Sequence, residues 1–393
     1  MKSIPRTVIT LGIISLFTDM ASEMLYPVLP LFMTEVGFTV LGIGFLEGFA
    51  QLVVGYAKGY FGRWSDVSKV RVPFVRWGYA MSAISKPLMG WIMSSAGLFL
   101  LRSMDRLGKG VRTAARDALL AQEATPETKG RIFGFHRSMD TLGASLGPLL
   151  ALAFLFYRPD DLRYLFYLAI VPGILAIGFA WRLKERGGTI SVTRATRPGW
   201  SDFFRYWRRS PSGYRLVVGG LLGFGLLNSS DFFLLLQLQS LGYSEKAIIG
   251  FYIFYNMVYA LLAYPSGILA DRWKFKSIFA IGILCYGLVY GGMGLFHNPF
   301  YLLALFLLYG VYAAMTEGIA KAWISNLVPQ NELATGIGAY EAMLSVSAFL
   351  ASLIAGWIWY SLGAQYLFIT VGLLGLMVSG FFFLKPIPEN NLE

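Results

Sequence analysis

Gly62-Arg-Trp-Ser-Asp66 and Gly267-Ile-Leu-Ala-Asp271 are two copies of one short pattern, Gly-x-x-x-Asp, placed 205 residues apart in a chain of 393. Each copy closes the second long apolar segment of its half of the chain, and basic residues follow each aspartate. The same offset maps Gly37 onto Gly242, so about thirty residues stay in register without a gap. A repeat of this kind predicts two copies of one membrane-embedded unit in the same orientation, the plan of a two-bundle transporter.

The composition of the chain indicates a membrane protein. It is 56% hydrophobic and 14% charged, with a mean hydropathy of +0.58, which an ordinary soluble domain does not show. A bilayer core about 30 Å thick needs about 20 apolar residues for each helix that crosses it. We count twelve such segments, near residues 7–33, 39–61, 73–95, 97–120, 132–156, 164–182, 214–239, 247–270, 277–296, 300–327, 334–361 and 364–385. The alternating segments of membrane-spanning strands are not found, so we expect an all-α membrane protein with twelve transmembrane helices.

The distribution of Lys and Arg predicts the orientation of these helices. Basic residues gather in the links after even-numbered segments, whereas the links after odd-numbered segments are nearly uncharged apart from 158–163. Positive links face the cytoplasm, so both termini are expected there, in a multi-pass protein of a bacterial cytoplasmic (inner) membrane. The net charge of +11 is then explained by the basic residues that orient the helices in the membrane, and no nucleic-acid partner is expected. The N-terminal segment does not fit a cleaved signal peptide.

The longest link divides the chain into three parts. We expect an N-terminal six-helix bundle over residues 1–183, a basic cytoplasmic linker over 184–213 and a C-terminal six-helix bundle over 214–393. Within the linker, Asp202–Arg209 combines aromatic and basic residues, as an amphipathic helix on an anionic membrane surface would. Cys285 is the only cysteine, which excludes an intramolecular disulfide and a cysteine metal or haem site. No metal and no cofactor are expected.

These features resemble the major facilitator superfamily over essentially the whole chain. Its members have two parallel six-helix halves, with Gly-x-x-x-Asp and basic residues after helices two and eight. The first copy here departs from the usual form at Val67 and Ser68, where the family has a basic residue and a glycine. Arg106-Leu-Gly-Lys109-Gly110 resembles a helix-four pattern of the family, with Lys109 in place of Gln. The resemblance implies two bundles around a central cavity and transport by alternating access.

The repeated motif also has a physical interpretation as a latch. Gly62 and Gly267 allow neighbouring helices to approach closely. Asp66 and Asp271 can pair with cations or cap the N-terminus of a helix in the opposite half, and such contacts would break and re-form if the halves rock. The alternative is an ordinary orienting loop with a solvated aspartate. The candidate gating residues are Gly62, Asp66, Lys69, Arg71, Gly267, Asp271 and Arg272.

Two acids on the first segment are candidate coupling residues. Asp19 and Glu23 are four residues apart, so they share one helix face. A charge at mid-membrane costs about 3 kcal/mol or more. Such a carboxyl is therefore either a proton carrier that alternates between protonation and pairing or one member of a permanent ion pair. Through the family resemblance, Arg106 is the expected partner of Asp19 or Glu23.

The fourth segment carries an unusual charged stripe. Its ionisable residues follow spacings of three and four and cannot face lipid: Arg102, Asp105, Arg106, Lys109 and Arg112. Asp105 can neutralise one of these cations in place. The remaining positive charge would attract an anionic or zwitterionic solute, which predicts a substrate with at least one acidic group.

The second half offers fewer charges. Asp231 follows a polar run on the seventh segment. Glu317 and Lys321 on the tenth segment are four residues apart, so they can neutralise each other. Together with the acids of the first segment and the stripe of the fourth, these three residues complete the candidate cavity.

The fifth segment contains a helix-packing motif, Gly143-x-x-x-Gly147-Pro148. It resembles a motif that the family's proton-driven exporters carry. Its glycines offer a close-packing face and Pro148 a kink, so it can limit leakage between the halves. Spaced small residues are also common in membrane helices, and the motif separates export from import only through the resemblance.

Secondary active transport is the leading function. We expect a proton-coupled exporter (antiporter) of a small amphiphilic or anionic organic solute, with a proton-coupled importer (symporter) of a metabolite or siderophore as the alternative. A non-transport receptor or enzyme is disfavoured: no nucleotide-binding loop or His-Glu-x-x-His helix occurs, and His136 and His297 are the only histidines. The expected partners are a small-molecule substrate, protons and the lipid bilayer, and the expected state is a monomer.

Overall fold

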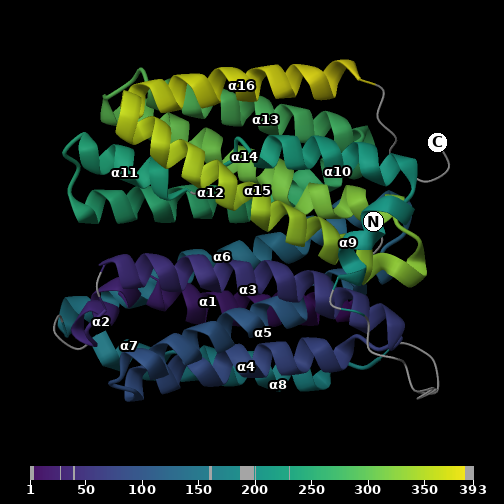
Figure 1. Cartoon of the computed structure of the whole chain (residues 1–393), viewed down its shortest axis with the longest axis horizontal. Helices are drawn as coiled ribbons and strands as arrows, with labels where there is room; N and C mark the ends of the chain where they lie inside the picture. The colour runs from purple at the N-terminus through teal and green to yellow at the C-terminus, as the bar shows by residue number, and fades with distance from the viewer. Residues whose placement is uncertain are drawn as a thin grey trace. The chain divides into compact units, whose positions relative to one another are not determined.

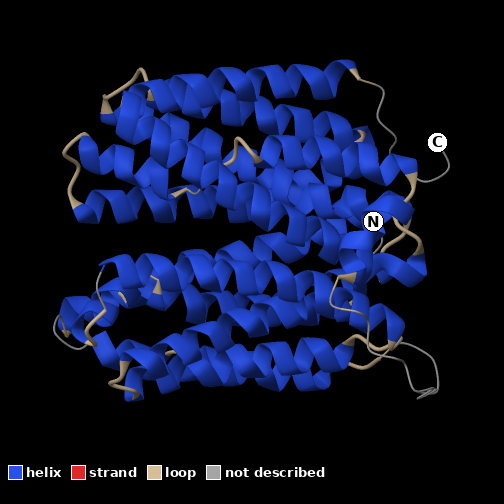
Figure 2. Cartoon of the chain, viewed as in Figure 1, coloured by secondary structure: helices blue, strands red, loops and turns tan. Residues whose placement is uncertain are grey.

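The computed structural model describes residues 4–26, 28–38, 40–158, 162–185, 199, 201–229 and 231–385. Within these ranges every regular element is a helix and no strand occurs (Figure 2), which confirms the all-α prediction. Each predicted apolar segment is helical, but three are interrupted. The first is divided into α1 (Arg6–Leu25) and α2 (Leu29–Glu35), the sixth into α7 (Leu162–Leu168) and α8 (Ile170–Arg182), and the seventh into α10 (Ser212–Gly225) and α11 (Phe232–Ser240).

Many of these helices suit a bilayer. Among the described residues, 8 stretches are long and apolar enough to cross a membrane: Arg6–Leu25, Pro126–Tyr157, Leu162–Arg182, Ala247–Trp273, Phe275–Met293, Pro299–Leu327, Gln330–Leu362 and Ala364–Leu384. The second, third, fourth and seventh predicted segments are absent from this set; the first three of these carry charged side chains, and the seventh is broken. The twelve-span topology therefore stays a prediction.

The chain folds into two compact units. Unit 1 contains Met1–Glu123, Met139–Arg209 and Pro329–Ala342, and unit 2 contains Ala124–Ser138, Ser210–Val328 and Met343–Glu393. In unit 1, α5 (Ser95–Gln122) packs against both α3 (Val40–Val67) and α4 (Val72–Trp91), while α8 packs against α1 and α4 (Figure 1). In unit 2, α13 (Phe275–Met293) lies between α14 (Pro299–Leu327) and α16 (Ala364–Leu384), and α12 (Glu245–Trp273) packs on α14.

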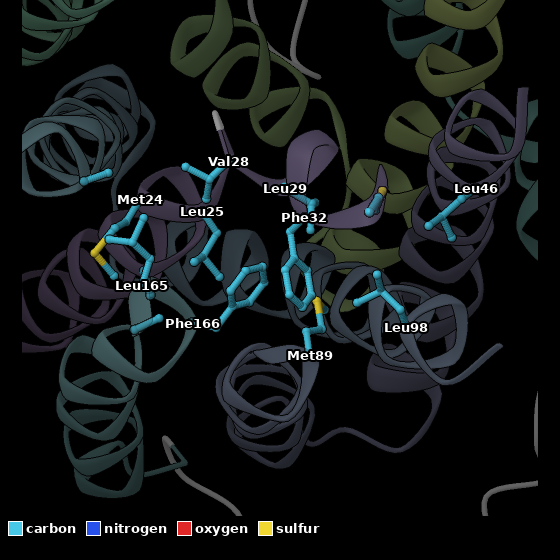
Figure 3. Packing of buried hydrophobic residues seen from close by; sticks show 14 residues of the cluster. Met24, Leu25, Val28, Leu29, Phe32, Leu46, Met89, Leu98, Leu165 and Phe166 are labelled. Carbon is cyan, nitrogen blue, oxygen red and sulfur yellow. The ribbon is translucent and has the colours of Figure 1, made fainter. Parts of the chain in front are cut away.

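Large apolar side chains fill one end of unit 1. Phe32 of α2 and Phe166 of α7 pack with their ring centroids 4.6 Å apart, and Met89 and Leu98 close the same cluster from α4 and α5 (Figure 3). In a bilayer such packing stabilises chiefly through dispersion contacts, because lipid tails are as apolar as the side chains. The cluster fixes the short helix α2 against the long helices that carry the charged residues.

Two long helices contribute to both units. In α6 (Lys129–Tyr157), Lys129–Ser138 belongs to unit 2 and the remainder to unit 1; in α15 (Leu333–Leu362), Leu333–Ala342 belongs to unit 1 and the remainder to unit 2. Each follows a short 3-10 turn, η1 (Pro126–Thr128) or η2 (Gln330–Glu332). These two turn–helix elements correspond at an offset of 204 residues, so the sequence repeat extends into the structure.

Backbone geometry supports the same repeat. Gly37 and Gly242, which correspond in sequence, adopt φ values of +94° and +84°, a conformation that glycine tolerates without steric cost. Lys69 and Lys274, which follow the two Gly-x-x-x-Asp copies, have φ values of +55° and +119°. A positive φ, which non-glycine residues rarely adopt, therefore recurs at the corresponding position after each motif.

Candidate functional site

Much of the charged stripe of α5 pairs with neighbouring side chains of unit 1. Arg102 and Asp105 are buried, Arg106 is half-buried and Lys109 is exposed. Arg102 Nε donates to Glu47 Oε1 at 2.8 Å, and Lys86 Nζ donates to Asp105 Oδ1 at 2.8 Å. Asp105 Oδ2 also lies 3.4 Å from Arg102 Nη1, and Arg106 lies 3.8 Å from Glu47. We call these five paired residues the α5 ion network. Asp105, which was expected to neutralise one cation, contacts two.

Sequence reasoning missed two members of this network. Glu47 of α3 and Lys86 of α4 each lie in an apolar segment with one other charged residue, Lys58 or Arg76. An ionisable residue in a membrane segment is energetically costly, so its presence indicates a charged or polar partner in the protein. This cost is the sequence signal from which both residues could have been found. Because Glu47 and Lys86 carry opposite charges, the network of three cations and two acids keeps a net positive charge.

A second acidic group forms around α1. The Asp19 carboxyl lies in hydrogen-bonding contact with the Asp140 carboxyl of α6, and Lys109 is the cation that interacts most strongly with it. Ser15 donates a hydrogen bond to Asp140 Oδ1. We call these two acids the Asp19–Asp140 pair. Arg106, the expected partner, instead pairs with Glu47 and interacts electrostatically with Glu23.

The glycine motif of the fifth segment lies directly beside this pair. A Cβ at Gly143 would collide with the Leu16 carbonyl, and one at Gly147 would lie 2.6 Å from the Met20 oxygen. Both α1 residues flank Asp19 in sequence. Because glycine has no side chain, Gly143 and Gly147 allow the α6 backbone to contact α1 beside the acidic pair. Pro148 follows Gly147 inside the same helix.

At the first Gly-x-x-x-Asp copy, Asp66 joins the end of α3 to the start of α15; we call this contact the α3–α15 junction. Asp66 Oδ2 accepts hydrogen bonds from the Thr335 amide at 2.6 Å and the Thr335 hydroxyl at 2.8 Å. Its Oδ1 accepts from buried Arg71 at 2.8 Å. The carboxylate therefore caps a helix from the other half of the sequence and also pairs with a cation.

Close packing and further ion pairs support this junction. A Cβ at Gly62 would collide with the Ala334 carbonyl oxygen. Lys58 Nζ lies 2.5 Å from Glu341 Oε2, and Arg63 lies 3.8 Å from Glu332. Glu341 of α15 thus pairs with a lysine of α3.

At the second copy, Asp271 joins the end of α12 to the start of α6, the α12–α6 junction. Asp271 Oδ1 accepts from the Gly130 amide at 2.6 Å, and Oδ2 accepts from the Arg131 amide at 2.8 Å. A Cβ at Gly267 would collide with the Gly130 carbonyl oxygen. The geometry repeats that of the first copy, but both contacts of the carboxylate are backbone amides. Arg272, like Lys69 after the first copy, is exposed.

The candidate residues of unit 2 separate into two places. Asp231, at the break between α10 and α11, accepts hydrogen bonds from the hydroxyls of Tyr255 at 2.8 Å and Tyr309 at 2.5 Å. Glu317 of α14 forms an ion pair with Arg137 of α6. The sequence predicted Lys321 as the partner of Glu317 and did not indicate Arg137. Lys321 lies one turn further along α14.

The linker helix α9 (Asp202–Arg209) packs against protein. Phe203 is buried, and its ring fills the space beside Gly59 of α3, where a Cβ would collide with it. Tyr206 is buried too, and that burial raises the pKa of its hydroxyl. Two aromatic residues expected at the membrane surface therefore anchor the helix to unit 1, because the glycine leaves room for a ring. Residues 186–198 and 200 of the predicted linker lie outside the described residues.

Buried ion pairs within long apolar helices, and a capped helix junction that recurs in each unit, define a membrane transporter built from a duplicated unit. The Major Facilitator Superfamily model matches residues 11–259 and 239–393. The chain belongs to this family, so it is a multi-pass membrane transporter that takes a small-molecule substrate, and it is not an enzyme.

Relatives and solved structures agree with this assignment. The chain is 34% identical over 364 residues to an uncharacterised transporter of the family from Methanocaldococcus jannaschii, covering 91% of this chain and 89% of that protein. It is 26% identical over 191 residues to the multidrug resistance protein MdtG of Salmonella heidelberg, covering 46% and 45%. The fucose:proton symporter of E. coli superposes with a TM-score of 0.73 at 11% identity, covering 97% of this chain and 99% of that chain.

Proposed function

We propose that this protein is a proton-coupled exporter (antiporter) of a small amphiphilic or anionic organic solute, working by alternating access of two six-helix bundles. The observation that carries the proposal is the contact between the Asp19 and Asp140 carboxyls beside Lys109. Arg102, Asp105 and Arg106 on α5 are held in ion pairs and are less suited to carry a proton.

The chemistry of two touching carboxyls favours proton exchange. At low dielectric two such groups do not both ionise, so the pair holds a proton between them. Loss of that proton leaves two like charges in contact, with Lys109 near Asp19 and Arg116 near Asp140. Deprotonation is therefore tied to a change in the surroundings, such as arrival of a solute or rearrangement of α1 against α6. That link is what coupled transport needs.

The direction of transport is proposed from the same region. Contact of the Gly143 and Gly147 backbone with α1 leaves little room for water beside the acidic pair, which suits an exporter that must not leak protons. The partial similarity to a multidrug resistance protein is in keeping with export. The alternative, symport of solute and proton, uses the same carboxyls.

The two junctions are proposed as the cytoplasmic latches of alternating access. Each fixes the end of one helix to the first turn of a helix from the other half of the sequence, through Asp66 or Asp271. These hydrogen bonds are short but few, so they can break and re-form during a transport cycle. Gly62, Gly267 and Arg71 belong to the same proposal.

The proposed setting is the bacterial cytoplasmic membrane, with both termini inside and the transporter as a monomer. Exposed Trp and Tyr side chains on the opposite face are in keeping with a second membrane interface there: Trp91, Tyr157, Tyr301 and Tyr360. Amphipathic rings favour such interfaces. All lie next to links after odd-numbered segments.

Inverted membrane vesicles test direction and coupling together. A pH gradient, acidic inside, is imposed and a panel of amphiphilic and anionic solutes is offered outside. We expect accumulation of at least one solute in inverted vesicles, with matched alkalinisation of the lumen. Uptake confined to right-side-out vesicles with an acidic outside, together with acidification of the lumen, would establish symport instead. Solute movement without any proton movement would remove proton coupling.

A further inference from the structure

The interrupted helix α10–α11 of unit 2 carries a feature that the proton pair does not use. α10 ends at Gly225 and α11 begins at Phe232. In a bilayer the backbone groups freed by such a break need partners within the protein. The Tyr286 hydroxyl is the partner of one such group, because it donates a hydrogen bond to the Leu227 carbonyl at 2.8 Å. Broken membrane helices are also where transporters bind ions and charged substrate groups.

The carboxylate of Asp231, at the end of this break, is held by hydroxyl groups. Tyr255 donates to Oδ2 at 2.8 Å and Tyr309 to Oδ1 at 2.5 Å. Two donors on one carboxyl fit its ionised form, which only accepts hydrogen bonds. Within the part of the chain that the structure describes, no Lys or Arg forms an ion pair with Asp231. Among the described residues, no cation therefore compensates its negative charge.

The surroundings of this carboxylate are aromatic. The Tyr255 and Tyr309 rings lie 5.2 Å apart, and Tyr309 and Tyr312 lie 5.3 Å apart. Tyr286 follows, 5.0 Å from Tyr312. The side-chain oxygen of Asn228, in the same break, is buried with no hydrogen-bond partner among the described residues. Ring faces and acceptor oxygens beside an ionised carboxylate are the groups that bind organic ammonium ions.

We infer that the α10–α11 break is a subsite for the ammonium group of an organic solute, with Asp231 as its counter-ion and the tyrosines beside it. The inference rests on the proposed function and narrows the exported amphiphile to one that carries a cationic nitrogen. An alkali metal ion fits less well, because it takes a shell of oxygen atoms. Here two hydroxyls already direct their hydrogens toward the carboxylate.

Calorimetric titration of the purified full-length protein tests this subsite without requiring transport. The probe is benzyltrimethylammonium, with benzyl alcohol and benzoate as neutral and anionic comparators, in potassium buffer. We expect wild-type protein to bind the ammonium probe at least about tenfold more tightly than either comparator. Asp231→Asn should lose that preference and Asp231→Glu should keep most of it. Glu35→Gln, which removes an exposed carboxylate elsewhere, should bind as wild type does.

The outcomes separate this inference from the proposed function. Equal affinity for the three probes in wild-type protein would overturn the ammonium subsite whether or not any variant folds. Unchanged preference in a folded Asp231→Asn protein would overturn it too, as would displacement of the probe by millimolar Na⁺ in place of K⁺. A vesicle experiment without proton movement would instead remove proton coupling and leave a positive binding result intact.

Discussion

The interiors of the two units use matched helix positions for different chemistry. In unit 1, Lys86 and Asp105 form a buried ion pair at 2.8 Å. The residues 204 positions later are Tyr290 and Tyr309, which are buried in unit 2 among other tyrosines. Where unit 1 places two opposite charges against each other, unit 2 places hydroxyls and rings, and Tyr309 donates to Asp231.

This difference shows how the two copies of a duplicated scaffold can take different roles. Buried ion pairs contribute little net stability, but they are costly to disrupt and they fix which helices lie together. The α5 ion network therefore suits a unit that must position a proton-carrying pair. Tyrosine hydroxyls are neutral, so they hold Asp231 in place without neutralising it. The unit with fewer charges is accordingly the one that offers an uncompensated charge to a ligand.

The largest expected effect is on the ion network. In Asp105→Asn, the Lys86 ammonium group loses the carboxylate with which it pairs, and Lys86 is only 3% exposed. Removal of one partner of a buried ion pair costs about 3–5 kcal/mol, so the free energy of unfolding should fall by that amount, measured by denaturant titration in detergent with circular dichroism. The double variant Lys86→Met/Asp105→Asn should recover much of the loss. A single variant as stable as wild type would show that the network does not hold unit 1.

The two junctions provide the next comparison. Asp66→Ala removes a helix cap and leaves buried Arg71 without its partner, so we expect a loss of about 3 kcal/mol. Asp271→Ala removes contacts to backbone amides only, so the expected loss is about 1 kcal/mol, typical of a helix cap. The same titration measures both. Equal losses would mean that the Arg71 pair adds nothing and that the junctions are equivalent.

The smallest expected effect is at the tyrosine site. In Asp231→Asn the amide oxygen can still accept from one hydroxyl, and no buried cation loses its partner. We expect the unfolding free energy to change by less than about 1 kcal/mol, compared with the large loss at Asp105. A loss of 3 kcal/mol or more would show that Asp231 is a structural acid, with a partner of the kind found in unit 1.

The helices followed from the sequence, while most contacts between them did not. Apolar length located each helical segment because a bilayer sets that length. The spacing of Asp19 and Glu23 correctly placed both on α1, but a helical period cannot say which neighbour a face meets. Asp140, Glu47 and Lys86 were therefore missed as partners.

The two motif aspartates show the same limit. Their position at a helix end predicted that Asp66 and Asp271 could cap a helix of the other half, and the structure has both as caps. The sequence did not indicate that Thr335 and Gly130 would be the donors, because backbone amides have no side-chain signature and the Thr335 hydroxyl is one of many in the chain. The break before Asp231 was visible only as a polar run.

Proton movement in liposomes tests the central claim most directly. Protein is reconstituted with a pH-sensitive dye inside, and a transported solute from the vesicle panel is added to wild type, Asp19→Asn, Asp140→Asn and the control Glu35→Gln. The account predicts solute-driven proton flux in wild type and the control, and its loss in both pair variants at unchanged melting temperature. Wild-type flux in both Asp19→Asn and Asp140→Asn would contradict it.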